Sequence, residues 1–361
     1  MRTIAAILAP LVLFGAAPAT AGPAQSADAV TLRAQLLVVG ATSMAPLVDT
    51  LVPGLVRKTG MAPPEVRLGG SVEGMKAFCA GVGVDHPDIA LATRRMTKTE
   101  FDRCQQTGVL DIIELEIGHG ALLAVVKTGD PVFDLSARVA YLGLAAQTPA
   151  PESGEDFQAN PFARWHQIHP RLPDLAIQVF GPSPASGSRA VVETMLMENG
   201  CRGIPAIGRI FSAERRFRQC TRMRADGAYV DVPEPFATNA IERMLAAPPG
   251  AIAITSYAGY RRYAGRVTAL PVAGVAPSPE EFQNNGYPWV TSYYAYFKRG
   301  HMRDKFGRGV ARGLREFMEE ILGDAAAGPN GYLGRAGFVP LDPQDRLDQL
   351  ARARRLERFT R

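Results

Sequence analysis

The sequence of 361 residues carries a net charge of +5 and a hydrophobic fraction of 47%. A single hydrophobic core usually stops growing near about 250–300 residues, so a chain of this length is expected to fold as two domains. The positive charge is spread along the chain without the basic block that nucleic-acid binders show. The composition therefore favours an attraction for anions, and we expect no nucleic-acid partner.

The N-terminus has the three parts of a secretory signal peptide. A basic start, Met1-Arg2-Thr3, precedes an apolar run from Ile4 to Ala17, and Ala19-Thr20-Ala21 ends it as an A-x-A cleavage site. The apolar run is shorter than the roughly 20 residues that a membrane span needs. A lipid anchor would require a cysteine at the cleavage point, but the first cysteine is Cys79. We therefore expect residues 1–21 to be removed and the mature protein to be periplasmic and not lipid-anchored.

Four cysteines suit an oxidising compartment, where disulfides form and persist. They are Cys79, Cys104, Cys201 and Cys220, and three pairings are open from the sequence. The pairs Cys79–Cys104 and Cys201–Cys220 are favoured because each closes a short loop within one region. No C-x-x-C or nearby Cys/His spacing indicates a metal, and we expect neither a metal nor a cofactor.

Short apolar segments alternate along the chain with longer segments of helical character. Strands are expected at 35–39, 65–68, 88–92, 112–117, 121–126, 176–180, 251–255, 267–270 and 293–297, with Gly118-His119-Gly120 joining the fourth and fifth. Helices are expected at 45–59, with a kink or break at Pro53, and at 72–80, 96–107, 190–197, 213–223, 236–247, 306–322 and 343–361. Repeated strand–loop–helix cycles predict parallel sheets covered by helices, an α/β class.

Three of the strand-to-helix connections carry hydroxyl groups. They are Thr42-Ser43-Met44, Gly69-Gly70-Ser71 and Ser186-Gly187-Ser188-Arg189. Each one alone is explained by an ordinary Ser or Thr N-cap. In open α/β sheets, however, ligands bind beyond the carboxyl ends of the strands, where the N–H groups of helix N-termini favour anions. Three such loops together predict an oxyanion site built from hydroxyl and backbone N–H donors.

Several segments, in their order and spacing, resemble the periplasmic phosphate-binding proteins that serve phosphate ABC transporters. These segments are Gly40–Leu47, Gly70–Gly81, Asp88–Arg94, Ser186–Arg189, Pro249–Ala253 and Gly286–Trp289. The resemblance implies a two-domain, type II periplasmic-binding-protein fold with the ligand in a cleft between the domains and a two-crossing hinge. It also implies inorganic phosphate or a related tetrahedral oxyanion as ligand, an ABC transporter permease in the inner membrane as partner, a monomer, and no enzymatic activity.

The resemblance further implies which residues hold the anion. They are Thr42, Ser43, Met44 (through its N–H), Ser71, Thr93, Arg94, Ser186, Gly187, Ser188 and Arg189. Thr93 stands where some members carry an Asp that accepts the proton of hydrogen phosphate, and Pro182 stands where they carry an Arg. Arg94 and Arg189 are then expected to supply the positive charge. Without a carboxylate acceptor, which would repel a fully deprotonated oxygen, we expect weaker exclusion of sulfate.

The domains expected from these segments are 30–118 plus 255–340 for domain I and 119–254 for domain II, followed by a C-terminal basic amphipathic helix at 341–361. Two other functions stay open: an anion-sensing or adhesion module without transport, and a hydrolase that uses one of the loop serines. The hydrolase is disfavoured because neither G-x-S-x-G nor Ser-x-x-Lys occurs at these loops.

Overall fold

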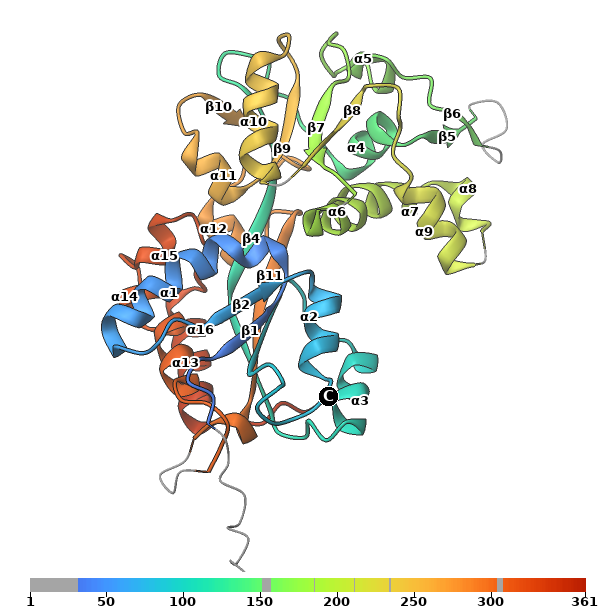
Figure 1. Cartoon of the computed structure of the whole chain (residues 1–361). Coiled ribbons are helices and arrows are strands. Elements are labelled where there is room, and N and C mark those ends of the chain that lie inside the picture. Colours follow the sequence, from blue (N-terminus) through green and yellow to red (C-terminus); the bar gives the residue numbers. More distant parts are fainter. Residues whose placement is uncertain (1–31, 151–156, 185, 211, 234, 304–307) are drawn as a thin grey trace, which may run out of the picture.

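A computed structural model describes residues 32–150, 157–184, 186–210, 212–233, 235–303 and 308–361 of the chain. Figure 1 shows two lobes of helices and strands, joined by the long strand β4 (Ile112–Lys127) and its neighbour β11 (Val290–Lys298). The expected signal peptide, residues 1–21, lies outside the described residues.

The secondary-structure elements alternate as the sequence predicts. The strands are β1 (Leu37–Gly40), β2 (Glu65–Leu68), β3 (Ile89–Ala92), β4 (Ile112–Lys127), β5 (Gln147–Pro149), β6 (Phe157–Ala159), β7 (Val179–Pro182), β8 (Tyr229–Val232), β9 (Ile252–Ser256), β10 (Val267–Ala269) and β11 (Val290–Lys298). The helices before the second lobe are η1 (Thr42–Met44), α1 (Ala45–Thr59), α2 (Ser71–Phe78) and α3 (Lys98–Gln106).

The remaining helices are shorter on average. They are α4 (Ala137–Leu144), α5 (Trp165–Ile168), α6 (Gly187–Val192), the π-helical η2 (Glu193–Glu198), α7 (Asn199–Arg202), α8 (Pro205–Gly208), α9 (Ala213–Thr221), α10 (Phe236–Ala246), α11 (Tyr257–Arg262), α12 (Pro279–Gln283), η3 (Arg299–His301), α13 (Leu314–Leu322), α14 (Asp324–Ala327), α15 (Tyr332–Arg335) and α16 (Pro343–Arg355). Because α6, η2 and α7 follow one another directly, the helix expected at 190–197 begins earlier and ends later.

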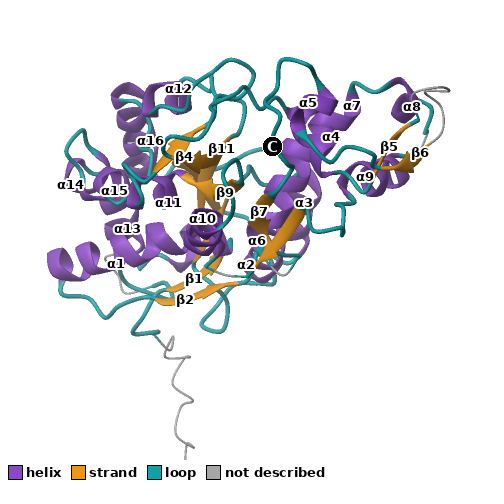
Figure 2. Cartoon of the chain, turned by 90° about the horizontal axis from the view of Figure 1, so that it is seen from above, coloured by secondary structure: helices purple, strands orange, loops and turns teal. Residues whose placement is uncertain are grey.

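The strands form a path in the order β2-β1-β3-β11-β4-β9-β7-β8, and β10 pairs with β4. β1 is parallel to β2 and β3, and β7 is parallel to β8 and β9. β11 is antiparallel to β3 and to β4, which in turn is antiparallel to β9. Figure 2 shows β4, β9 and β11 in the middle of the molecule with helices around them, and the pair β5 and β6 at its edge. The α/β class is confirmed, with a mixed sheet in place of the purely parallel sheets expected.

β4 is one continuous strand where two were expected. The glycines of the expected connection serve close packing: a Cβ on Gly118 would lie 2.4 Å from the Phe338 ring, and one on Gly120 would lie 1.9 Å from the Tyr293 hydroxyl. Gly118 has φ +151°, and β11 accommodates it with a register shift between Tyr293 and Tyr294. The strand therefore continues through the Gly-His-Gly segment into the second lobe.

Each lobe has its own hydrophobic core, and β4 contributes to both. Ile113, Leu115 and Ile117 are buried in the first lobe together with α1 and α13. Leu123 and Val125, further along the same strand, are buried with helices and strands of the second lobe. Along β4, the change from one core to the other thus falls near residues 118–120.

The chain returns to the first lobe later than expected. Tyr257, Val267, Phe282 and Trp289 are all buried in the core of the second lobe, although the expected domain I resumed at residue 255. The return is made by β11, whose residues Ala295 and Phe297 lie in the first core. The apolar segments between 257 and 289 carry no signal that would tell which core they join.

Three local elements also differ from expectation. The helix α1 continues through Pro53 without a break. The Pro- and Gly-containing stretch from 128 to 173, for which no element was expected, holds α4, β5, β6 and α5. The helix expected at 306–322 begins at Leu314, after Gly313 with φ +96°, and residues 304–307 lie outside the description.

The C-terminal helix is an integral part of the first lobe. Leu350 and Ala353 of α16 are buried in its core. The Arg346 guanidinium donates to the Leu322 carbonyl at 2.7 Å, and the Phe359 N–H beyond the helix donates to the Ile112 carbonyl at 2.7 Å. The apolar face of this segment is therefore covered by its own protein.

Both favoured cysteine pairs are bonded. Cys79–Cys104 links the ends of α2 and α3 in the first lobe, and Cys201–Cys220 links α7 and α9 in the second. Each disulfide stays within one lobe, so neither restricts movement of the lobes relative to each other.

Candidate functional site

A cleft of about 670 Å³ lies where the two lobes meet. Its walls combine residues of the first lobe, the crossing strands and the second lobe: Thr42, Ser43, Ala45, Pro46, Asp49, Thr93, Gly120, Ala121, Leu122, Ser188, Val191, Pro235, Ala237, Thr238, Ser256, Ala258, Gly259, Arg261, Arg262, Thr291, Tyr293, Arg335 and Ala336. Hydroxyl groups predicted from two different halves of the sequence, those of Ser43 and Ser188, therefore face one cavity.

The first hydroxyl loop is the single 3₁₀ turn η1 between β1 and α1. Thr42 and Ser43 line the cleft, and the Thr42 hydroxyl oxygen is buried with no hydrogen-bond partner among the described residues. The Met44 N–H was expected to face the anion, but it donates to the Ala41 carbonyl at 3.0 Å and closes the turn. The Met44 side chain is fully buried in the first core. Met44 thus stabilises the turn, while Thr42 and Ser43 line the cavity.

The second loop is brought to the first by close packing of glycines. A Cβ on Gly74 would lie 2.6 Å from the Gly40 Cα, so α2 can sit this close to the end of β1 only without a side chain at position 74. Ser71 begins α2, whose first-turn N–H groups have no intrahelical acceptor. The Ser71 and Thr93 hydroxyl oxygens lie 3.4 Å apart, and Thr93 lines the cleft. Strand β3 therefore delivers a second hydroxyl beside Ser71.

The third loop belongs to the second lobe and follows β7. Ser186 is the N-cap of α6, and its hydroxyl accepts from the Ser188 N–H at 3.2 Å. Ser186 and Ser188 are both buried, and Ser188 lines the cleft. Gly187, which lies between these two serines, is the first residue of α6. The Ser188 N–H is therefore occupied by the Ser186 hydroxyl, and Ser188 can donate to a ligand through its own hydroxyl.

Arg189 points into the protein and is held by acids of the second lobe. Its guanidinium donates to Asp231 at 2.8 Å, to Glu193 at 2.9 Å and to the Pro182 carbonyl at 3.1 Å. It also lies over the Tyr229 ring, 5.2 Å from the centroid. Arg189 is therefore placed to fix the Ser186–Ser188 loop against β7 and β8, and it is absent from the cleft lining.

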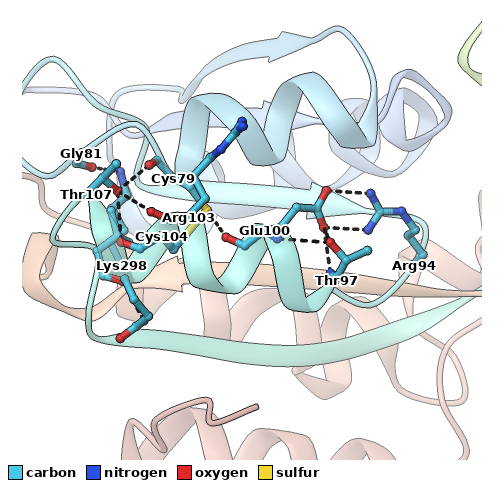
Figure 3. The surroundings of a disulfide bond; sticks show 11 residues. Cys79, Gly81, Arg94, Thr97, Glu100, Arg103, Cys104, Thr107 and Lys298 are labelled. Atoms are coloured by element: carbon cyan, nitrogen blue, oxygen red, sulfur yellow. Dashed lines mark hydrogen bonds and ion pairs between the residues drawn. A yellow bond between two sulfur atoms is a disulfide. The ribbon is translucent and has the colours of Figure 1, made fainter.

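Arg94 is similarly engaged in the first lobe. Figure 3 shows its guanidinium facing Glu100, which it contacts through two hydrogen bonds of 2.7 and 2.8 Å. Glu100 also closes the predicted capping box with Thr97. The hydrogen bond with Glu100 raises the pKa of Arg94 above its ordinary value. The arrangement ties the end of β3 to the start of α3 and leaves Thr93 facing the cleft.

A family model described as a PBP superfamily domain matches residues 20–325 of the chain. The chain belongs to the PBP superfamily. Its two-lobed α/β architecture is the type II periplasmic-binding-protein fold, which solved structures of low sequence identity share. A structure described as a possible phosphate binding protein from Planctomyces limnophilus has a TM-score of 0.61 and 15% identity, covering 91% of this chain and 100% of that chain.

Two further proteins resemble this chain over most of its length. An ABC-type phosphate transport receptor from Vibrio cholerae has a TM-score of 0.57 and 15% identity, covering 84% of this chain and 99% of that chain. Protein SphX of Synechocystis sp. is 22% identical over 339 residues, which are 92% of this chain and 83% of SphX. Every helix in the described part of this PBP-superfamily member is too short or too polar to traverse a lipid bilayer.

Some residues of the PBP cleft were missed by the sequence analysis. Arg261 and Arg262 at the end of α11, Arg335 at the end of α15 and Asp49 on α1 are the charged groups among its described lining residues. One signal could have indicated α11. The strand β9 ends at Ser256, and the Ser256 hydroxyl caps the helix by accepting from the Gly259 N–H at 3.1 Å. This is a fourth strand-to-helix connection with a hydroxyl.

Proposed function

We propose that this protein captures phosphate, or a tetrahedral oxyanion of the same shape, in the cleft between its lobes and delivers it to an ABC transporter in the inner membrane. The observation that carries the proposal is the meeting of Ser43 and Thr93 from the first lobe with Ser188 from the second in one cleft. Hydroxyl donors from two lobes suit a small anion with acceptor oxygens on every side. The named relatives, a phosphate transport receptor among them, support the same ligand and partner.

The domains of the proposed binding protein are the two lobes. Domain I is residues 30–118 plus the chain from about 290 onward, and domain II is about 119–289, with β4 and β11 as the two crossings. Because both lobes contact the anion, binding favours the state in which the cleft is closed, by the difference in affinity between the two states. Closure would bring the Ser188 hydroxyl toward the Ser43 turn.

The proposed ligand set is the hydroxyls of Thr42, Ser43, Ser71, Thr93 and Ser188, with N–H groups of the loops around them. Each hydrogen bond to a charged partner contributes about 1.5–3 kcal/mol net, so a handful of them gives micromolar binding or tighter after the anion is dehydrated. In this proposal Arg94 and Arg189 act indirectly, because each holds an anion loop through its acidic partners. No chemical step is involved. Residues 1–21 would direct export to the periplasm and be removed in the process.

Calorimetric titration of the ligand-stripped mature protein with phosphate, arsenate, sulfate, molybdate and tungstate tests the proposal. We expect a single site for phosphate with a dissociation constant in the micromolar range or below, and an affinity at least about tenfold weaker in Ser188→Ala. Val191→Ala, which alters the same wall of the cleft without removing a hydroxyl, is the matched control and should bind within about twofold of the unaltered protein. Absence of heat with all five anions would contradict the proposal, as would turnover of phosphate esters abolished by Ser186→Ala.

A further inference from the structure

The cleft carries positive charge that its hydroxyl loops do not explain. Arg261, Arg262 and Arg335 line it, and the Asp49 carboxylate is the one acidic side chain among its described lining residues. All three arginines are exposed to solvent. The cleft therefore presents a net positive wall on the side of α11 and α15.

These arginines differ from the two that the sequence singled out. Arg94 and Arg189 are each neutralised by a carboxylate within hydrogen-bonding distance. The guanidinium groups of Arg261 and Arg262, in contrast, neither donate a hydrogen bond to nor form an ion pair with any residue that the structure describes. Arg335 donates to the Asn330 carbonyl, a neutral group that leaves its charge uncompensated. Unpaired guanidinium groups on a cavity wall are available to an anionic ligand.

The space is also larger than one phosphate requires. A volume of about 670 Å³ lies within the range of about 300–1,000 Å³ typical of sites for small organic molecules, whereas phosphate has five heavy atoms. A second hollow of about 490 Å³ adjoins the cleft, and Arg261 and Arg335 line both. No carboxylate is found among the described residues that line this second hollow. Arg261 and Arg335 thus stand where the cleft meets this second hollow.

We propose that the cleft takes anions with at least two phosphate groups, such as short linear polyphosphates. One phosphate would occupy the hydroxyl loops, and the next would be held by Arg261 and Arg262. The planar guanidinium fork matches the oxygens of a phosphate group and binds them with two parallel hydrogen bonds. Asp49, on the wall of the first lobe, repels the additional phosphate and directs it toward α11. This inference rests on the proposed function, because it assigns the first phosphate to the same loops.

The test is a calorimetric comparison of phosphate, pyrophosphate, tripolyphosphate and glucose 6-phosphate on the mature protein. The variant is Arg261→Gln with Arg262→Gln, and the matched control is Arg222→Gln with Arg243→Gln, which removes the same charge from exposed positions of the second lobe outside the cleft. In the unaltered protein and the control, pyrophosphate should bind at least about tenfold more tightly than phosphate. In the cleft variant this advantage should disappear, so that phosphate and pyrophosphate bind with affinities within about threefold of each other.

The outcomes separate this inference from the proposed function. Pyrophosphate binding no tighter than phosphate would overturn the inference and leave the phosphate site intact. The inference also fails if the tenfold advantage survives in the cleft variant, if the control loses it equally, or if glucose 6-phosphate binds as tightly as pyrophosphate. Absence of binding by phosphate and by all the larger anions would instead overturn the proposed function.

Discussion

Replacing Arg189 by alanine should destabilise the second lobe far more than it weakens anion binding directly. Its partners Asp231 and Glu193 are 52% and 26% exposed, so solvent screening limits each ion pair to about 0.5–1 kcal/mol. The charged hydrogen bond to the Pro182 carbonyl adds about 1.5 kcal/mol, at the low end because the Tyr229 hydroxyl also donates to that carbonyl at 3.0 Å. Together these contacts amount to about 3 kcal/mol.

A loss of about 3 kcal/mol lowers the melting temperature of a domain of 150–250 residues by about 6–12 °C. Differential scanning calorimetry of the ligand-stripped protein measures this shift, and Arg243→Ala, an exposed arginine of the same lobe, should stay within about 0.5 kcal/mol of the unaltered protein. Phosphate affinity in Arg189→Ala should fall by less than about tenfold, since the loop loses a support and no ligand. An unchanged melting temperature combined with abolished phosphate binding would refute this reasoning and place Arg189 on the anion.

Three other perturbations have defined outcomes. Replacing Cys201 and Cys220 together by alanine should reduce the free energy of unfolding of the second lobe by about 3 kcal/mol, because the disulfide closes a loop with a sequence separation of 19. Urea denaturation measures this change, and an unchanged urea midpoint would contradict the prediction. Burial lowers the pKa of Lys298 from 10.5 to about 7, so between these two pH values the unfolded chain binds more protons than the folded protein. The free energy of unfolding should therefore rise from pH 7 to pH 9 by up to about 1.4 kcal/mol per pH unit. A parallel rise in Lys298→Met would argue against this cause. Thr93→Asp should increase the preference for phosphate over sulfate by at least about tenfold in competition titrations, because a carboxylate accepts the phosphate proton and repels sulfate, and equal weakening of both anions would count against a ligand role for residue 93.

Local sequence signals were sufficient for the hydroxyl loops and for the disulfides. Ser71 and Ser188 each follow a short strand and lie in the first turn of a helix. The strand, the hydroxyl loop and the helix start lie within about ten residues of one another, so a local stretch of sequence is enough to predict them. The convergence of the loops follows from a general property of α/β sheets, whose strand ends gather ligands. This is why Ser43 and Ser188 could be assigned to one site although they are distant in sequence.

The charges of the site could not be assigned in the same way, because a partner for an arginine is set by tertiary structure. Arg94 forms its hydrogen bond with Glu100, six residues away, and the helix cap at Thr97 brings the two side chains close. Arg189, in contrast, donates to Asp231 on β8, which lies close because β8 pairs with β7. Arg261 lies in the short helix α11, and the sequence around it is typical of an exposed surface. Only the tertiary structure places Arg261 in the cleft. The lobe to which residues 257–289 belong was unpredictable for the same reason, since either core accepts apolar segments.

The most direct test of the central claim is a crystal structure of the mature protein grown with arsenate, with diffraction data collected at the arsenic absorption edge. The account predicts one strong anomalous peak in the cleft, within hydrogen-bonding distance of the hydroxyls of Ser43, Thr93 and Ser188. It further predicts that the lobes are closed around the anion. Arsenate bound elsewhere on the protein, or a cleft without an anomalous peak at millimolar arsenate, would contradict the account.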